Sequence, residues 1–338
     1  MRGVTVEELG DLVIPWLGFE PGEARVVDTG KVKIEVRIND DFKLLLRDAA
    51  TKKKVAKLPE SAPAELKEEF KELPAVLKEA VKSQLLRMET LMVRQFRWPV
   101  DRWRELYLQH PLLLPFAHRL VWANYDETGR LLGTFRTLDD HSLTDPADEA
   151  VELPSQGTIG IVHPLELSLE TRQAWLKHLA DYDVTPPFAQ LERPVITVKD
   201  QQKNTRFGQE IAGTELNAMT FKGRAERLGW ARGAVCDGGG ITSYLKRFPT
   251  AGVDVFVETE GMYVGIDMYT NIKLGKVFFT KHGTVKTGSY TYDEPGEEKD
   301  PRLLSYGEVP AIAFSESMGD LTRISGKGEP EKNEVSGV

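Results

Sequence analysis

The chain is poor in the features that mark secreted and membrane proteins. Cys236 is the one cysteine among 338 residues, so an internal disulfide is excluded and a reducing compartment is indicated. Nowhere do the roughly 18 consecutive apolar residues of a membrane-spanning helix occur. The first twelve residues, MRGVTVEELGDL, lack the apolar core of a secretory signal. We therefore expect a cytoplasmic protein of bacterial type without a membrane partner.

The motifs of the common enzyme classes are also missing. The chain has no Gly-x-x-x-x-Gly-Lys-Ser/Thr loop, no Gly-x-Gly-x-x-Gly after a strand, no Gly-x-Ser-x-Gly and no His-Glu-x-x-His. One cysteine and six dispersed histidines form no recognisable zinc pattern. The sequence thus indicates no metal site and identifies no cofactor, and it disfavours the common nucleotide-binding, hydrolase and metalloprotease classes.

The net charge of −8 is unevenly distributed along the chain. Residues 293–338 hold eleven acidic and five basic residues, a net of −6. Residues 43–57 hold six basic residues against one acidic residue, a net of +5, and residues 203–247 hold eight against four, a net of +4. Either basic segment could bind nucleic acid or another anion. Ordinary solvated faces of strands and helices are the favoured explanation of both segments.

Periodicity predicts an α+β fold that opens with an N-terminal antiparallel β meander. Residues 31–39 alternate between apolar and polar types, and strands at 42–46 and 55–58 follow. Apolar residues then recur at three- and four-residue spacing from Leu66 to Phe96, which predicts a long amphipathic helix that Pro74 should kink or split. A further helix is predicted at 100–109.

The remainder of the chain predicts a mixed or antiparallel sheet with packed helices. A hairpin is expected from 119–125 and 131–137, a buried strand at 158–163 and a helix from Ser168 to Ala180. Later elements are a helix at 214–228 and strands at 193–198, 230–236, 241–248, 253–258, 262–268 and 276–280. The expected divisions are 1–62 (helix and meander), 63–111 (helical), 112–282 (α+β core) and 283–338 (charged loop and disordered tail).

Two local patterns contain histidines that invite a functional interpretation. The apolar, aromatic stretch 96–122 carries His110, His118 and Arg119, which we expect to be buried and hydrogen-bonded because unpaired polar groups are costly there. His163 and Glu166 directly follow a buried strand. These two are candidate catalytic residues, with His163 as general base and Glu166 orienting it. A histidine that caps the following turn is the structural alternative.

The strongest candidate for ligand binding lies at residues 229–240. Consecutive glycines could let backbone amides form an anion-binding nest, while Arg232 supplies a bidentate charge and Trp230 a stacking face. A tight strand connection beside a core tryptophan is the alternative. Arg193 is a candidate for the same pocket, as is His163, although a loop pinned by Arg193 to a carboxylate is also expected. The predicted ligand-binding residues are Arg193, Trp230, Arg232, Asp237, Gly238, Gly239 and Gly240.

These segments together resemble the uncharacterised C-terminal domain of MolR-type proteins, the molybdate metabolism regulators of bacteria. The resemblance spans about residues 31–280 and is carried by Trp103 and by segments 110–113, 119–122, 163–167, 181–191 and 229–239. It implies no settled activity. Some members carry a WGR domain, a module associated with nucleic-acid binding. Trp230-Ala231-Arg232 only resembles the Trp-Gly-Arg motif in the name of that domain and does not indicate the domain here. Because family members are often much longer, the short length suggests either a stand-alone C-terminal portion or a fragment of a larger protein.

The sequence therefore predicts a non-catalytic binding or regulatory module of a MolR-like bacterial protein. Its partner would be another protein or the remainder of a longer family member, and a small anionic ligand is a further expectation. Two alternatives stay open. One is an enzyme that acts on a nucleotide or phosphorylated substrate through His163. The other is a nucleic-acid-binding module that uses the basic segments.

Overall fold

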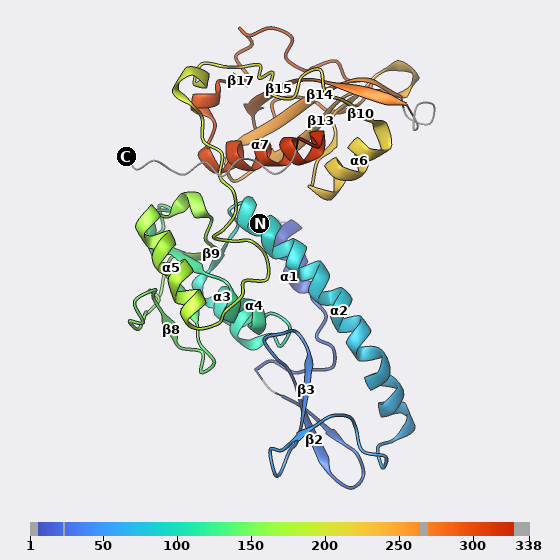
Figure 1. The fold of residues 1–338 in the computed structure, drawn as a ribbon, viewed down its shortest axis with the longest axis vertical. Helices are drawn as coiled ribbons and strands as arrows, with labels where there is room; N and C mark the ends of the chain where they lie inside the picture. Colours follow the sequence, from blue (N-terminus) through green and yellow to red (C-terminus); the bar gives the residue numbers. More distant parts are fainter. Residues whose placement is uncertain (1–5, 23, 264–269, 328–338) are drawn as a thin grey trace, which may run out of the picture. The chain divides into compact units, whose positions relative to one another are not determined.

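The computed structural model describes residues 6–22, 24–263 and 270–327, and the chain divides into two compact units, Met1–Glu192 and Arg193–Val338 (Figure 1). Both units combine helices with mainly antiparallel sheets, so the α+β prediction is confirmed. The divisions predicted after residues 62, 111 and 282 stay predictions.

The N-terminal unit begins with the expected meander. Helix α1 (Val6–Leu12) precedes a four-stranded antiparallel sheet in the order β1 (Arg25–Asp28), β2 (Lys33–Ile38), β3 (Leu44–Asp48) and β4 (Lys54–Val55). The alternation in β2 turns Ile34 and Val36 into the core, where both are fully buried. They cluster with Phe19, Val27 and Leu46, and half-buried Leu66 and Phe70 from the next helix pack against this cluster.

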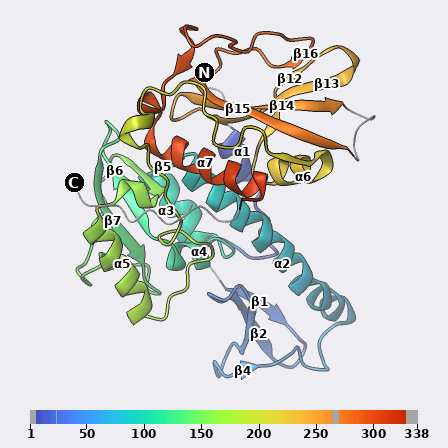
Figure 2. The same ribbon diagram turned by 45° about the horizontal axis from the view of Figure 1, so that its top comes forward.

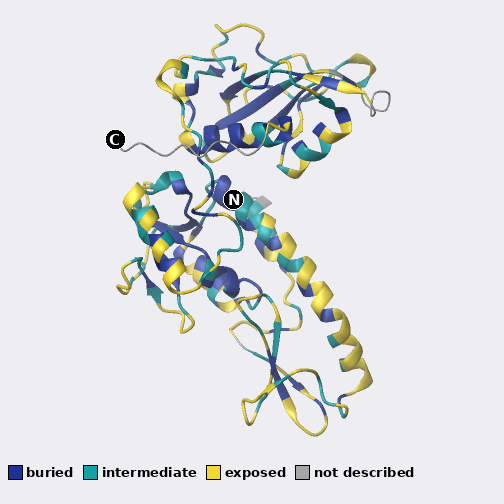
Figure 3. Cartoon of the chain, in the orientation of Figure 1, coloured by how far each residue is buried: buried dark blue, intermediate teal, exposed yellow. Residues whose placement is uncertain are grey.

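Helix α2 (Ala64–Val93) runs without a break through Pro74, so the prediction that the proline could split it is wrong. Pro74 is exposed, and the helix can relax on its solvent side to accommodate the ring. Buried Leu73, Leu77 and Met88 mark its inner stripe, while its outer face is exposed along much of its length (Figure 3). Among the described helices, none combines the length and apolar character needed to span a bilayer.

A second antiparallel sheet completes this unit. Its order is β5 (Arg97–Pro99), β9 (Thr158–Ile161), β6 (Trp122–Tyr125), β7 (Leu131–Thr137) and β8 (Leu143–Thr144), and it is accompanied by α3 (Val100–Gln109), α4 (Leu114–Arg119) and α5 (Leu169–Asp181). Trp98, Trp103, Tyr107 and Trp122 form a buried aromatic core, with Trp103 and Trp122 ring centroids 5.2 Å apart. The aromatic stretch of the sequence is thus the centre of this unit.

The C-terminal unit is built on a larger sheet (Figure 2). Its order is β10 (Glu215–Asn217), β15 (Asn271–Lys281), β14 (Val253–Tyr263), β13 (Gly240–Phe248), β12 (Ala234–Val235) and β16 (Gly288–Ser289). Strand β11 (Ala231–Arg232) adds to β13 and β17 (Leu303–Leu304) to β15; β12 and β16 pair in parallel and the other pairs are antiparallel. Helices α6 (Ala218–Arg227) and α7 (Ala311–Ser325) belong to the same unit.

Three sequence-based expectations fail in this unit. Residues 193–198 form no strand; the Ile196 amide instead donates to Ser315 Oγ at 2.9 Å. The helix expected from residue 214 begins at Ala218, because the Asn217 side chain caps it and β10 precedes it. Helix α7 lies within residues 283–338, where a charged loop and a disordered tail were expected, because the composition does not reveal the partners of its buried acidic residues. Part of the strand expected at 262–268 and of the tail lies outside the described residues.

Candidate functional site

His163 and Glu166 cap the N-terminus of a short helix that follows strand β9. His163 is fully buried, and its Nδ1 accepts a hydrogen bond from the Leu165 amide at 3.2 Å. Glu166 Oε2 accepts from the His163 amide at 2.9 Å, and Glu166 Oε1 accepts from the Tyr125 hydroxyl at 2.8 Å. Together they close a reciprocal capping box on the short 3₁₀ helix Pro164–Glu166. This geometry favours the structural alternative for the pair.

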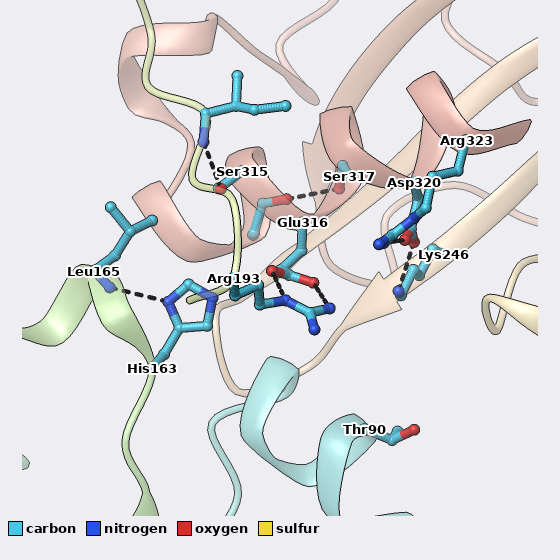
Figure 4. A network of polar contacts seen from close by, with 12 residues as sticks. Thr90, His163, Leu165, Arg193, Lys246, Ser315, Glu316, Ser317, Asp320 and Arg323 are labelled. Atoms are coloured by element: carbon cyan, nitrogen blue, oxygen red, sulfur yellow. Dashed lines mark hydrogen bonds and ion pairs between the residues drawn. The ribbon is translucent and has the colours of Figure 1, made fainter. Parts of the chain in front are cut away.

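Arg193 contacts Glu316 of helix α7 (Figure 4), and Trp230 contacts Asp320 of the same helix. The Arg193 guanidinium donates twice to the Glu316 carboxylate, and the Trp230 indole donates to Asp320 Oδ2 at 3.0 Å. Asp320 also pairs with Lys246 and Arg323, at 2.7 and 2.8 Å. The expected loop pinned by Arg193 to a carboxylate is confirmed.

Arg232 and the glycine turn have a different setting. Arg232 is exposed on β11, whereas Trp230 is only 2% exposed and offers no open stacking face. Residues 237–239 form the turn between β12 and β13, where Gly238 and Gly239 adopt φ of +72° and +79°, and Gly240 begins β13. The Gly239 amide donates to the Cys236 carbonyl at 3.1 Å, and the Asp237 amide to the Tyr292 hydroxyl at 3.4 Å. These two amides are therefore already used within the turn.

A groove of about 890 Å³ in the N-terminal unit was not predicted from the sequence. It lies between the β meander and helix α2. Its lining residues are Asp41, Phe42, Lys43, Leu44, Leu46, Ala56, Lys57, Leu58, Glu60, Lys67, Phe70, Lys71, Pro74, Leu77, Lys78 and Val81. The volume falls in the range of about 300–1,000 Å³ that is typical of ligand sites. We refer to it as the lysine groove.

The lysine groove combines apolar walls with a basic edge. Its apolar side chains come from the turn before β3, from β3, from the segment that follows β4 and from α2. Five exposed lysines stand against two acidic residues. Lys43, Lys57 and Lys78 form no ion pair among the described residues. An apolar ligand that also carries negative charge would match both properties.

A sequence signal for this groove existed in two separate pieces. Lys67, Lys71 and Lys78 follow one another at spacings of four and seven residues, which places them along one side of a helix. The basic segment 43–57 supplies the remaining two lysines. Only the fold shows that the two stretches face the same hollow.

A second, polar cleft of about 610 Å³ lies in the same unit and includes His118 and Arg119. His118 Nδ1 lies 2.8 Å from Asp40 Oδ1, and Arg119 donates to the carbonyls of Thr185 and Asp40 at 2.7 and 2.8 Å. The predicted hydrogen-bonded roles of these two residues are confirmed. His118, Asp40 and Asp139 are the described residues whose side chains are placed to hold a metal ion.

Comparison with known proteins gives a family but no activity. The family described as "Domain of unknown function (DUF4132)" matches residues 51–230, just over half of the chain. "Uncharacterized protein YehI" of Escherichia coli (strain K12) is 30% identical over 235 residues, which cover 66% of this chain and 19% of that protein. The chain thus spans about a fifth of the length of this relative. No solved structure matches.

Proposed function

The chain belongs to the DUF4132 family, and from that premise we propose that it is a non-catalytic binding module whose lysine groove holds an acidic amphipathic helix of a protein partner. The observation that carries the proposal is the pairing of apolar walls with five lysines in one groove. An amphipathic helix buries one apolar face in such a groove, and acidic residues beside that face would meet the lysines.

Charge and shape support a peptide over the alternative partners. A nucleic-acid backbone would use the lysines but leave Phe42, Phe70 and Leu77 without an apolar contact. An enzyme with His163 as base would need that ring to reach a substrate, and it is fully buried in a cap. Both alternatives, and the anion site around Arg232, stay predictions. So do a MolR-type kinship, a regulatory role and a cytoplasmic location.

The partner could be a separate protein or another part of a longer family member. The relative from Escherichia coli extends far beyond the matched region, since the alignment covers 19% of it. We therefore propose that helices in the remainder of such a protein are a source of the acidic segment. The chemistry of recognition is the same for either source.

The test is fluorescence anisotropy with two labelled peptides of about 18 residues and one heptad pattern, one Leu/Glu and one Leu/Lys. The full chain should bind the Leu/Glu peptide at least tenfold more tightly. Charge reversal at the groove, Lys43→Glu with Lys78→Glu, should weaken that binding at least tenfold. The matched control is Lys53→Glu with Lys82→Glu, because both lysines are exposed and neither lines the groove.

Three outcomes would overturn the proposal. The control pair could weaken binding as much as the groove pair, which would reduce the effect to net charge. A second such outcome is that neither the Leu/Glu nor the Leu/Lys peptide binds the chain. An anionic fatty acid could bind saturably while the Leu/Glu peptide does not bind, which would make the occupant an acyl chain.

A further inference from the structure

The polar cleft in the N-terminal unit differs from the lysine groove in the sign of its charge. Its lining holds five aspartates against two arginines and one histidine. A free anion would be repelled there, whereas a divalent cation would reduce the excess negative charge. The cleft is therefore suited to a cation.

Three side chains of this cleft converge. One ring nitrogen of His118 and one carboxylate oxygen each of Asp40 and Asp139 all lie within 4.8 Å of one another. His118 is only 9% exposed, while both aspartates are exposed. Its Nδ1 lies 2.8 Å from Asp40 Oδ1, and its buried Nε2 has no hydrogen-bond partner among the described residues. A buried imidazole at the base of a carboxylate-lined cleft is more than an acidic surface patch.

The fold holds these residues in place from three separate elements. Asp40 lies in the turn between β2 and β3, His118 on α4, and Asp139 two residues after the end of β7. The Arg119 guanidinium donates to the Asp40 carbonyl at 2.8 Å, which ties that turn to α4. Arg136 at the end of β7 donates to the His118 carbonyl at 3.4 Å. Arginine side chains thus hold the backbone around the site in place, while both carboxylates are exposed.

We propose that Asp40, His118 and Asp139 bind a divalent transition-metal ion, with Zn²⁺ as the best match. Bonds of about 2.1 Å at tetrahedral angles place ligand atoms about 3.4 Å apart. The widest separation within the group, at most 4.8 Å, would therefore close by up to about 1.4 Å, and the 2.8 Å separation of Asp40 and His118 would widen by about 0.6 Å. An imidazole with two carboxylates suits Zn²⁺ or Mn²⁺, whereas Mg²⁺ prefers oxygen ligands alone. Three protein ligands leave a position open for water or an exogenous ligand.

The sequence did not indicate this site. The three ligands are 78 and 21 residues apart in the chain, and none belongs to a recognised spacing. The site is independent of the lysine groove, so the failure of one proposal leaves the other standing.

The test is titration of the full, tag-free chain with Zn²⁺ in competition with a chromophoric chelator. Asp139→Asn should weaken Zn²⁺ binding at least tenfold, and His118→Gln should do the same. Asp183→Asn is the matched control, because it removes one negative charge from the same cleft without touching the proposed ligands; it should change the affinity less than about threefold. Co²⁺ should give visible absorption that is lost in Asp139→Asn.

Three results would overturn the site. Asp183→Asn could weaken Zn²⁺ binding as much as Asp139→Asn, or Mg²⁺ could bind as tightly as Zn²⁺; either would reduce the cleft to a general acidic surface. Zn²⁺ binding that is the same in wild type and in Asp139→Asn would place the ion elsewhere. Asp139 is exposed, so its substitution tests the proposal even if the His118 variant does not fold.

Discussion

The Arg193 guanidinium and the Glu316 carboxylate form a buried, bidentate ion pair, with the Nε–Oε1 and Nη2–Oε2 distances both 2.6 Å. Their side chains are 9% and 3% exposed. The pair joins the first residue of the C-terminal unit to helix α7, 123 positions along the chain. The ion pair therefore holds the start of the C-terminal unit against helix α7, the last described helix.

Removing either partner of this pair should destabilise the folded protein, because the charge of the other partner is then buried without compensation. We expect Arg193→Met and Glu316→Leu each to lower the free energy of unfolding by about 3–5 kcal/mol. The double variant should lose much less than the sum of the two. Urea unfolding of the four proteins in a double-mutant cycle measures the coupling. Additive losses below about 1 kcal/mol each would contradict this expectation and show that the ion pair contributes little to stability.

The local elements of the fold could be predicted from sequence because their signals are local. The helix at 100–109 and the hairpin strand at 131–137 match observed α3 and β7, and Ser168 caps α5 as its position indicates. Helix α7 could not be found in this way. Its buried Glu316 and Asp320 look like surface residues in the sequence, and only their partners Arg193, Trp230 and Lys246 allow their burial.

Two tryptophans of the aromatic core offer a matched comparison. Trp103 and Trp122 are both fully buried, but Trp122 Nε1 donates to the Ala117 carbonyl at 3.1 Å, while Trp103 Nε1 has no partner among the described residues. Both substitutions to Phe remove a similar volume. Trp122→Phe also breaks a buried hydrogen bond, whereas Trp103→Phe removes an unpaired donor. Trp103→Phe should therefore be the less destabilising by about 1–3 kcal/mol.

The measurement for this pair is urea unfolding followed by far-UV circular dichroism, which does not depend on tryptophan emission. Trp98→Phe serves as a second hydrogen-bonded reference, because Trp98 Nε1 donates to Asp11 Oδ2 at 3.0 Å. Equal losses for Trp103→Phe and Trp122→Phe would contradict the expectation and imply that packing alone decides both.

The candidate sites were harder to predict than the elements. Predicted Arg193 and Trp230 proved to contact α7, since a sequence cannot show which acidic residue faces a buried cation. The lysine groove and the Asp40, His118 and Asp139 cluster each combine residues from separate elements. Their sequence signals, a basic segment and an apolar stretch with a histidine, indicate burial and charge but not which residues meet.

His110 makes the stability of the N-terminal unit depend on pH. The ring is 1% exposed, and burial lowers its pKa from 6.5 to about 4, while its Nδ1 accepts from the Leu112 amide at 3.2 Å. The folded state thus holds the imidazole neutral, whereas the unfolded chain takes up a proton near pH 6.5. The contribution of the neutral His110 ring to the free energy of unfolding is fully present above that pH and is lost as pH falls from about 6.5 towards 4.

Between pH 7 and pH 5, wild type should lose about 2 kcal/mol more than His110→Asn, in which the amide oxygen can still accept from Leu112 but nothing titrates. Urea unfolding at both pH values measures this difference, and the other titrating groups cancel because both proteins share them. His141→Asn is the control, since it makes the same change at an exposed histidine and should keep the pH dependence of wild type. If His110→Asn keeps that dependence as well, the His110 ring must take up its proton in the folded protein at the same pH as in the unfolded chain, and its burial would have no effect on acid stability.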